Sequence, residues 1–381
     1  MAEDFVVTPW EVSGEIDYGK LVKEFGLTPM DDLPKAFTDN LLFRRKKVFA
    51  HRDFSKILSA MKERKPFVMM TGLMPTGKFH IGHAVLARQM IFYQSLGAKL
   101  YVAVADIEAF HARGQSLEES RRIAVEEYLL NYIALGLKPE RCEIYFQSDR
   151  SSDAKRAIAY YRLQNLLAKH ATFNEFKAVY GAVSPGKMVA ALLQAADMLH
   201  PQLPEFEGVV PVVVPVGTDQ DPHLRLARDL ASRTKSHHFT TLASTYHVFV
   251  PGLGGGKMSS SDEHSFIALT DTPKEMERKV KKYAFSGGRE SVDEHRKHGG
   301  NPDVDVAFQY LTFFEEDDGK LAKIRHDYTS GKLLSGEMKA ILIETLNAFL
   351  AEHQRKRELA RHRLHEYLAT PEEFAPHKRK R

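Results

Sequence analysis

The chain has 381 residues, of which 54 are Lys or Arg and 50 are Asp or Glu, so its formal net charge is +4, and 43% of its residues are hydrophobic. This composition is typical of soluble globular proteins and excludes a fibrous or disordered chain. No apolar run approaches the roughly 18 residues that a membrane span needs, and the N-terminal residues lack the pattern of a secretory signal. The single Cys142 cannot form an internal disulfide, and no His/Cys cluster has metal-site spacing. We therefore expect a cytoplasmic protein of about two or three domains.

Strand and helix patterns alternate after an N-terminal extension of short elements at 1–60. The apolar run at 66–72 predicts a buried strand, and a loop with Pro75 and Gly77 then leads to a helix that begins near His83 and ends at Gly97. The same patterns predict further strands at 100–105, 143–147 and 209–216, and an amphipathic helix at 116–136.

This alternation predicts an α/β fold with a parallel sheet, whose ligands bind beyond the carboxyl ends of the strands. After about residue 270 the sequence becomes helical and charged, and an apolar stripe runs through 338–350. We expect three parts: an extension at 1–60, a catalytic domain at 61–270 and a helical domain at 271–381.

Two histidines and a glycine stand between the first predicted strand and its helix, in the sequence His80-Ile81-Gly82-His83. Backbone N–H groups and the helix dipole favour a phosphate there, and imidazoles donate hydrogen bonds to phosphoryl oxygens. Gly82 has no Cβ, so the backbone can approach a bulky ligand such as adenine. Alone, the pattern also fits a helix start with a surface histidine.

A glycine-rich segment at 254–262, GGGKMSSSD, contains one lysine and three serines. The ammonium of Lys257 and the hydroxyls suit transient binding of a pyrophosphate leaving group. A flexible serine loop is the alternative for this segment alone. The two motifs together, in this order on a predicted sheet, are more specific than either one.

The histidine-glycine-histidine signature and the KMSSS segment together resemble the class I aminoacyl-tRNA synthetases. Other blocks resemble the archaeal and eukaryotic tryptophanyl-tRNA synthetases and extend over most of the chain. These blocks are 7–12 (VTPWEV), 16–18 (IDY), 51–53 (HRD), 284–289 (AFSGGR), 294–296 (EHR), 299–300 (GG) and 310–314 (YLTFF).

The resemblance implies a Rossmann-type catalytic domain with a C-terminal α-helical anticodon-binding domain. It also implies a homodimer that activates L-tryptophan with ATP and Mg²⁺, then charges tRNA(Trp). The catalytic residues would be His80, His83 and Lys257. The ATP-binding residues would be Thr76, Gly82, Gly217, Asp219, Gln220, Met258 and Ser259.

The amino-acid pocket must distinguish tryptophan from tyrosine. Tyrosyl enzymes typically place tyrosines where this chain has Met70 and Ala190. The segment 194–197 (QAAD) resembles bacterial tryptophanyl enzymes, whose aspartate accepts the indole N–H, a group that is only a donor. Alternatively, Asp197 lies on a helix surface and Met70 belongs to the core. The expected tryptophan-binding residues are Met70, Gly72, Ala103, Glu108, Gln194, Asp197 and Gln220.

The helical domain is the expected reader of the tRNA anticodon. By motif match, Arg289 and Glu290 lie where family members contact anticodon bases, although a local Arg–Glu surface pair is the alternative. The basic segments 354–365 and 377–381 can bind phosphates or form a solvated helix face and tail. A tyrosyl-tRNA synthetase and a non-catalytic RNA-binding or partner-binding paralogue remain the alternative functions.

Overall fold

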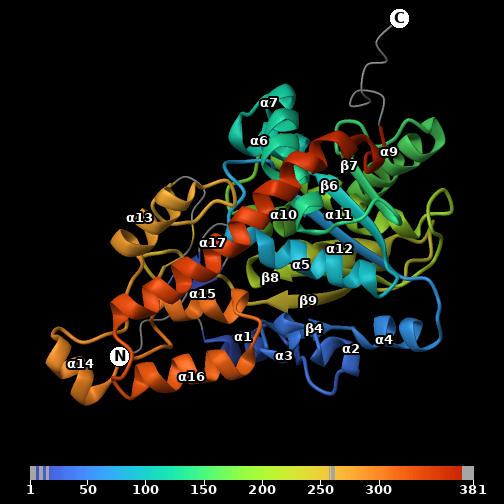
Figure 1. Cartoon of the computed structure of the whole chain (residues 1–381). Coiled ribbons are helices and arrows are strands. Elements are labelled where there is room, and N and C mark those ends of the chain that lie inside the picture. Colours follow the sequence, from blue (N-terminus) through green and yellow to red (C-terminus); the bar gives the residue numbers. More distant parts are fainter. Residues whose placement is uncertain (1–5, 8–11, 14–16, 257, 259–261, 371–381) are drawn as a thin grey trace, which may run out of the picture.

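The computed structural model describes residues 6–7, 12–13, 17–256, 258 and 262–370. Its centre is a seven-stranded sheet in which β9, β8, β5, β6 and β7 run parallel, while β4 is antiparallel to β9 and β3 is antiparallel to β4 (Figure 1). The strands, in spatial order, are β3 Thr28–Pro29, β4 Val48–Arg52, β9 Ala243–His247, β8 Val212–Gly217, β5 Val68–Leu73, β6 Lys99–Val104 and β7 Cys142–Phe146. A separate antiparallel pair consists of β1 Val6–Val7 and β2 Val12–Ser13.

The four predicted strands are confirmed as β5, β6, β7 and β8. All six residues of β8 and the first four residues of β5 are buried, because helices cover both faces of the sheet. The sequence did not indicate β9, which reads ASTYH and has no apolar run. Its Thr245 and Ser244 are nevertheless buried, and they lie within hydrogen-bonding reach of the hydroxyls of Tyr93 and Tyr246.

Successive β5 residues belong to two different hydrophobic clusters: Met69 packs on one face of the sheet and Met70 on the other. The first cluster includes residues of α5, α8 and the C-terminal helices, and the second includes residues of α9, α11 and α12. The helices up to residue 233 are α1 Tyr18–Glu24, α2 Lys35–Thr38, α3 Leu41–Arg44, α4 Ser55–Lys62, α5 Ile81–Ser95, α6 Asp106–Arg113, α7 Leu117–Ile123, α8 Leu130–Leu135, α9 Ala154–Ala168, α10 Phe173–Tyr180, α11 Pro185–Leu199 and α12 Asp221–Arg233, with a π-helical turn η1 Ala124–Leu129 and the 3-10 turns η2 His200–Gln202 and η3 Thr218–Gln220.

The predicted helices near 83–97 and 116–136 are both present. The second one spans α7, η1 and α8, which follow one another without a break, and it ends at Gly136 in the left-handed conformation. Helix α5 ends at Ser95, and the left-handed Gly97 follows it, as a helix end requires.

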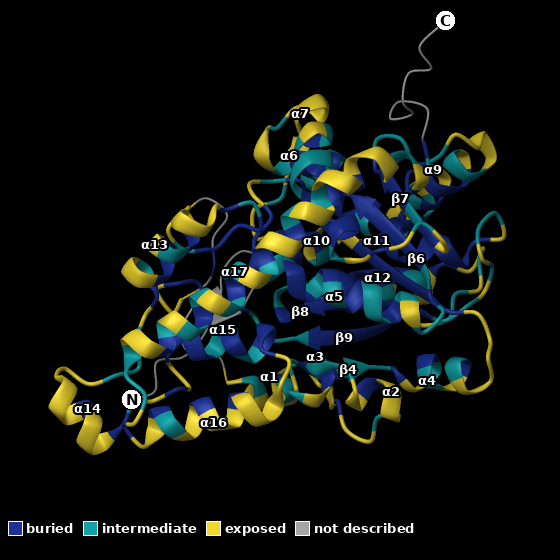
Figure 2. Cartoon of the chain, in the orientation of Figure 1, coloured by how far each residue is buried: buried dark blue, intermediate teal, exposed yellow. Residues whose placement is uncertain are grey.

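Beyond residue 270 the described chain is helical, as expected. It comprises α13 Pro273–Tyr283, α14 Val292–His298, α15 Val306–Phe314, α16 Asp318–Thr329, α17 Ser335–Ala360 and η4 Arg361–Glu366. Helix α17 carries the predicted apolar stripe, and its buried Leu342, Leu346 and Leu350 join the same cluster as the sheet. Figure 1 shows α17 crossing the molecule, while Figure 2 shows that α14 and α16 expose their outer sides.

The end of the described chain returns to the sheet. The N–H of Ile144 in β7 donates to the carbonyl of Tyr367 (2.9 Å), and the N–H of Ala369 donates to the carbonyl of Ile144 (2.8 Å). These bonds pair the C-terminal segment with the free edge of β7, so the helical region and the sheet share both a core and a strand edge.

Candidate active site

The expected site residues lie at the carboxyl ends of the parallel strands. The loop after β5 leads to His80 at the N-terminus of α5, and β6 is followed by α6, which carries Glu108. Strand β7 leads to Gln147, and β8 leads to the turn η3 that contains Asp219. Parallel strands place these ends on one edge of the sheet, where open α/β folds bind ligands.

His80 and His83 form a stacked pair at the first turn of α5, with ring centroids 3.7 Å apart. The N–H of Gly82 donates to Nδ1 of His80, and the N–H of His80 donates to Nδ1 of His83, both over 3.2 Å. These two acceptor roles keep the ring proton on Nε2 in each neutral imidazole. The pair therefore caps the helix with Nδ1 and retains two Nε2–H donors.

Both imidazoles are neutral at physiological pH. Burial lowers the pKa of His83 to about 4. Burial, together with the adjacent His83, lowers the pKa of His80 well below its usual value. The site thus offers these rings to a ligand as hydrogen-bond donors without a full positive charge.

The chain after the KMSSS segment pairs directly with the histidine motif. The N–H of Ile81 donates to the carbonyl of Ile267 (3.0 Å), and the N–H of Leu269 donates to the carbonyl of Phe79 (3.0 Å). The sulfur of the buried Met258 lies 3.2 Å from the position that a Cβ on Gly82 would occupy. The two motifs are therefore neighbours in space. Lys257 and Ser259 lie outside the described residues.

Gly217 ends β8 in a place where a side chain would collide with its surroundings. A Cβ there would lie 2.6 Å from Oδ1 of Asp219 and 3.0 Å from the ring of Phe249. Asp219 and Gln220 follow in the half-buried turn η3. Thr76 lies in the loop that follows the neighbouring strand β5, and its carbonyl accepts the hydroxyl of Tyr128 over 2.7 Å.

Asp197 is a buried acceptor inside the fold, on the inner side of α11, and only 3% of its surface is exposed. Its Oδ1 accepts the hydroxyls of Tyr145 (2.7 Å) and Tyr160 (2.6 Å), and its Oδ2 accepts Nε2 of Gln147 (2.7 Å). The alternative of a helix-surface carboxylate is therefore wrong. Burial raises the pKa of Asp197 to about 6, although its three donors oppose this shift. A carboxylate has about four acceptor positions, so Oδ2 can accept one further donor.

Glu108 lies close enough to Asp197 for the two charges to interact. Burial and then the negative charge of Asp197 raise the pKa of Glu108 to about 7. Gln194 lies one turn before Asp197 on α11, and its buried Oε1 has no hydrogen-bond partner among the residues that the structure describes. An unpaired buried acceptor is costly unless a ligand supplies the donor.

Apolar residues of the sheet lie next to this polar group. Met70 and Ala103 are buried in the same hydrophobic cluster as Tyr145 and Tyr160. Gly72, which pairs with Ala103 in the sheet, is exposed at the end of β5. The arrangement combines a flat apolar floor with an acceptor for one N–H group, which suits an aromatic ring that carries such a donor.

Comparisons with known proteins support this interpretation. The family model described as "tRNA synthetases class I (W and Y)" matches residues 61–351. The tryptophan–tRNA ligase of Aeropyrum pernix is 46% identical over 363 residues, which cover 93% of this chain and 95% of that protein. The ligase of Methanocaldococcus jannaschii is 41% identical, with 93% and 96% covered.

The chain belongs to the tryptophan–tRNA ligases of class I. A solved tryptophanyl-tRNA synthetase from Aeropyrum pernix superposes with a TM-score of 0.87 at 44% identity, and covers 92% of this chain and 96% of that one. These findings confirm the predicted family, the Rossmann-type fold and the enzyme class. They do not favour a tyrosyl-tRNA synthetase or a non-catalytic paralogue.

The segment that carries the expected anticodon residues starts next to Leu253, which shortly precedes the KMSSS segment in sequence. The N–H of Phe285 donates to the carbonyl of Leu253 (2.8 Å), and the chain then continues to the exposed Arg289 and Glu290. Nε of Arg289 donates to the carbonyl of Gly299 (3.0 Å). Within the described part of the chain, no ion pair joins Arg289 to Glu290, so that alternative is not found.

The basic segment 354–365 is helical, and several of its arginines already have acidic partners. Arg361 binds Glu126 through two hydrogen bonds of 2.6 and 2.8 Å, and Arg363 pairs with Glu366 at 2.8 Å. This pairing favours the alternative of a solvated helix face for this segment. The basic residues 377–381 lie outside the described part of the chain.

Sequence reasoning missed the partners that hold Asp197. Tyr145 and Gln147 had a possible signal, because they alternate along β7 and its end and therefore share one face. Tyr160 had none, since it comes from α9, 37 residues before Asp197.

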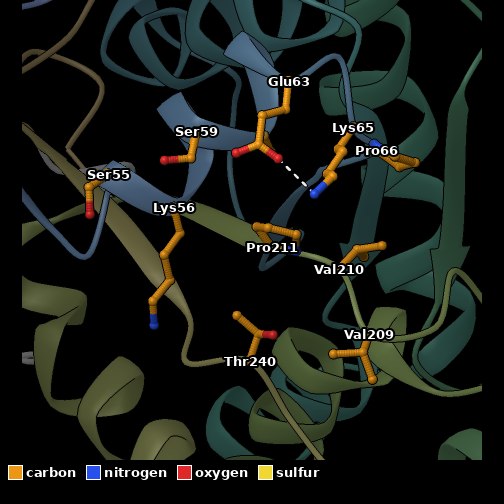
Figure 3. Close-up of a pocket in the computed structure, with 11 residues that line it drawn as sticks. Ser55, Lys56, Ser59, Glu63, Lys65, Pro66, Val209, Val210, Pro211 and Thr240 are labelled. Carbon is orange, nitrogen blue, oxygen red and sulfur yellow. Dashed lines mark ion pairs between the residues drawn. The ribbon is translucent and has the colours of Figure 1, made fainter.

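A cavity of about 420 Å³ lies on the opposite edge of the sheet, before the strands begin. Figure 3 shows Lys65 and Pro66, which precede β5, and Pro211, which precedes β8, together with Ser59 of α4 and Thr240. Because ligands of parallel sheets bind at the carboxyl ends, this cavity is separate from the candidate active site. None of the helices in the described ranges is long and apolar enough to cross a membrane.

Proposed function

We propose that the chain activates L-tryptophan with ATP to tryptophanyl-adenylate, releases pyrophosphate, and transfers the tryptophanyl group to the 3′ end of tRNA(Trp). The observation that carries this proposal is the pairing of the histidine motif with the segment that follows KMSSS, beside a buried acceptor for the indole. The names of the relatives, all tryptophan–tRNA ligases, point to the same reaction.

The first step is attack on phosphorus. A carboxylate oxygen of tryptophan forms a bond to the α-phosphorus of ATP, and the bond from that phosphorus to the pyrophosphate oxygen breaks. The Nε2–H groups of His80 and His83 donate to the phosphoryl oxygens on which negative charge increases. Lys257, with Ser259, supplies positive charge and hydroxyl donors to the departing pyrophosphate, a role assigned from the motif alone.

ATP lies between the two motifs in this proposal. Gly82 and Met258 bound the adenine region, while Thr76 lies in the loop before the histidine motif. Asp219 accepts ribose hydroxyls, and Gly217 leaves room for its carboxylate. Within the described ranges, no group of three or more His, Cys, Asp or Glu residues has a metal-site arrangement. Mg²⁺ would enter with the ATP phosphates and would neutralise part of their charge.

Tryptophan binds with its indole N–H on Oδ2 of Asp197 and its ring on Met70, Gly72 and Ala103. The unpaired Oε1 of Gln194 accepts the substrate ammonium, and Gln220 reaches the same head group. Glu108 contributes a polar contact at the mouth of the pocket. Phenylalanine lacks the N–H donor and would leave the remaining acceptor position of Oδ2 of Asp197 unfilled, so the site selects against it without editing.

For the second step, Arg289 and Glu290 are proposed to contact the anticodon of tRNA(Trp), with the helical region at 271–381 as the anticodon-binding domain. The same proposal takes 61–270 as the catalytic domain, 1–60 as an extension, a homodimer as the active assembly, and the cytoplasm as its location. The resemblance to the family supports these points.

Amino-acid-dependent ATP–pyrophosphate exchange tests the first step, with tryptophan, tyrosine and phenylalanine compared in the absence of tRNA. We expect exchange with tryptophan only. Exchange with tyrosine would refute the proposed indole pocket, and silence with all three would refute adenylation.

A variant pair then tests the histidine motif. His83→Asn keeps an acceptor for the N–H of His80 but removes the Nε2–H donor, so exchange should fall strongly while the helix cap remains. His298→Asn changes an exposed histidine on α14 and serves as the matched control, with unchanged exchange.

A further inference from the structure

Arg150 is a cation with no exposed surface, placed just after β7. Its Nη1 donates to Oε1 of Glu143 (2.6 Å), while Nη2 and Nε contact Nε2 of His200 at 2.8 and 3.2 Å. Burying an ion pair is costly, and apolar residues of similar volume often stabilise a fold equally well. Stability alone therefore does not account for a buried arginine at this position.

One connection runs from Arg150 through His200 to the backbone of Asp197. Because Nε2 of His200 accepts from the guanidinium, the ring proton lies on Nδ1. Nδ1 then donates to the carbonyls of Asp197 (2.9 Å) and Ala196 (3.1 Å) at the end of α11. Burial and the charge of Arg150 lower the pKa of His200 well below its usual value, so this ring is neutral.

A second connection runs through an aromatic ring to the side chain of Asp197. The guanidinium carbon of Arg150 lies 3.9 Å from the ring centroid of Tyr145, and the hydroxyl of Tyr145 donates to Oδ1 of Asp197 (2.7 Å). A cation over a ring restrains the ring and is favourable when both are desolvated. The two connections reach the main chain and the carboxylate of the same residue.

We propose that Arg150 is a positioning residue for tryptophan recognition, which holds the Asp197 carboxylate ionised and aimed at the indole N–H through His200 and Tyr145. This inference rests on the proposed role of Asp197 in the proposed function. It adds a residue that does not touch the substrate and that the sequence motifs do not contain.

The charges around Asp197 make the proposal measurable by pH. Tyr145 and Gln147 from β7 and its end, and Tyr160 from α9, donate to the carboxylate, while Glu108 on α6 repels it. Arg150 lies among the groups that lower the pKa of Asp197, against the larger effect of burial. Removal of its charge should therefore move protonation of Asp197 to higher pH.

The test compares Arg150→Met and Arg150→Lys with Arg156→Met. Arg156 is the matched control because it binds the same Glu143 (3.0 Å) and contacts the hydroxyl of Tyr101 (3.2 Å) but reaches no atom of Asp197 in the described contacts. ATP–pyrophosphate exchange is measured against tryptophan and ATP concentration from pH 5.5 to 8.5, and melting temperature is recorded for each variant.

For Arg150→Met, we expect the KM for tryptophan to rise about tenfold, because the loss of the charge-assisted contact with His200 leaves Asp197 less well positioned. The KM for ATP should not change. The acid limb of kcat/KM for tryptophan should shift upward by about one pH unit. Arg150→Lys should keep the acid limb and still raise the KM, since lysine lacks the planar fork. Arg156→Met should change neither.

An unchanged KM and acid limb in Arg150→Met, or equal losses toward tryptophan and ATP, would overturn the proposal. If Arg150→Met does not fold, Arg150→Lys decides, and a normal KM for tryptophan in that variant would overturn the proposal as well. Failure of the proposed function has a different signature, because the unmodified chain would then show no tryptophan-dependent exchange.

Discussion

Replacement of Asp197 by asparagine tests the tryptophan pocket most directly. The carboxylate accepts three hydrogen bonds of 2.6 to 2.7 Å, two on Oδ1 and one on Oδ2. In Asp197→Asn, the remaining oxygen satisfies the two tyrosine hydroxyls best, because both are donors on the same side. The new NH₂ group then takes the place of Oδ2 and faces both Gln147 and the indole N–H, which are donors as well.

The expected loss follows from the hydrogen bond that disappears. A bond to a charged group contributes about 1.5–3 kcal/mol, which corresponds to a fall in kcat/KM for tryptophan of about 10- to 150-fold. The KM for ATP should change little, since ATP makes no contact with Asp197 in the proposed site. Activity with phenylalanine should not fall, because its ring has no N–H, so the preference for tryptophan should shrink by the same factor.

The assay is ATP–pyrophosphate exchange with each amino acid, and Tyr160→Phe is the control. That variant removes one donor to Oδ1 but leaves Oδ2 unchanged, so it should cost a few-fold at most in kcat/KM for tryptophan. Unchanged tryptophan kinetics in Asp197→Asn would refute the assignment of Asp197. An equal loss toward ATP and tryptophan would show a general defect of the site and would refute the reasoning too.

Three further predictions follow from the geometry. Gly217→Ala should raise the KM for ATP at least several-fold and leave the tryptophan KM nearly unchanged, because its Cβ would meet Asp219 at 2.6 Å; kinetics with an unaltered ATP KM would contradict this. Arg289→Ala should impair tRNA charging while adenylate formation remains, and an equal loss of both activities would count against anticodon contact. Burial lowers the pKa of His353 to about 4, so the unfolded chain binds the extra proton first and stability decreases as the pH falls from 6.5 toward 4. Glutamine at position 353 can still donate to Asn131, as His353 does over 2.7 Å, but it does not titrate. The free energy of unfolding of His353→Gln, relative to that of the unmodified chain, should therefore rise by roughly 2 to 3 kcal/mol when the pH is lowered from about 7.5 to about 4.5. Denaturant unfolding at the two pH values measures this, and a difference that does not change with pH would refute the prediction.

The parallel part of the sheet was predictable because burial on both faces requires continuous apolar strands. β5, β6, β7 and β8 satisfy that requirement, and the helices between them show the expected periodicity. β9 could not be predicted in this way, since it has no apolar run. Its buried Ser244 donates to the hydroxyl of Tyr246 in the same strand, and its Thr245 accepts the hydroxyl of the distant Tyr93. The extension at 1–60 was expected to form short elements, but its β4 became part of the main sheet by pairing with β9, a contact almost 200 residues apart.

The candidate site was predictable to the extent that its residues belong to short motifs. His80, Gly82 and His83 act through local geometry, and a helix N-terminus is set by neighbours in sequence. The environment of Asp197 is different, because its donors come from β7 and α9, which are 37 to 52 residues away. Whether a carboxylate is a surface group or a buried acceptor depends on such long-range packing, and no local pattern contains that information.

The neutral state of the two motif histidines has a consequence for how charge is distributed in the proposed reaction. Burial lowers the pKa of His83 to about 4, and burial together with the adjacent His83 lowers the pKa of His80 well below its usual value. The pair therefore supplies N–H dipoles and no net charge. The leaving pyrophosphate carries far more negative charge than the α-phosphoryl group, and dipoles alone compensate it poorly. A cation beside the departing pyrophosphate is therefore favoured by the electrostatics, in agreement with the roles proposed for Lys257 and for Mg²⁺ on the phosphates.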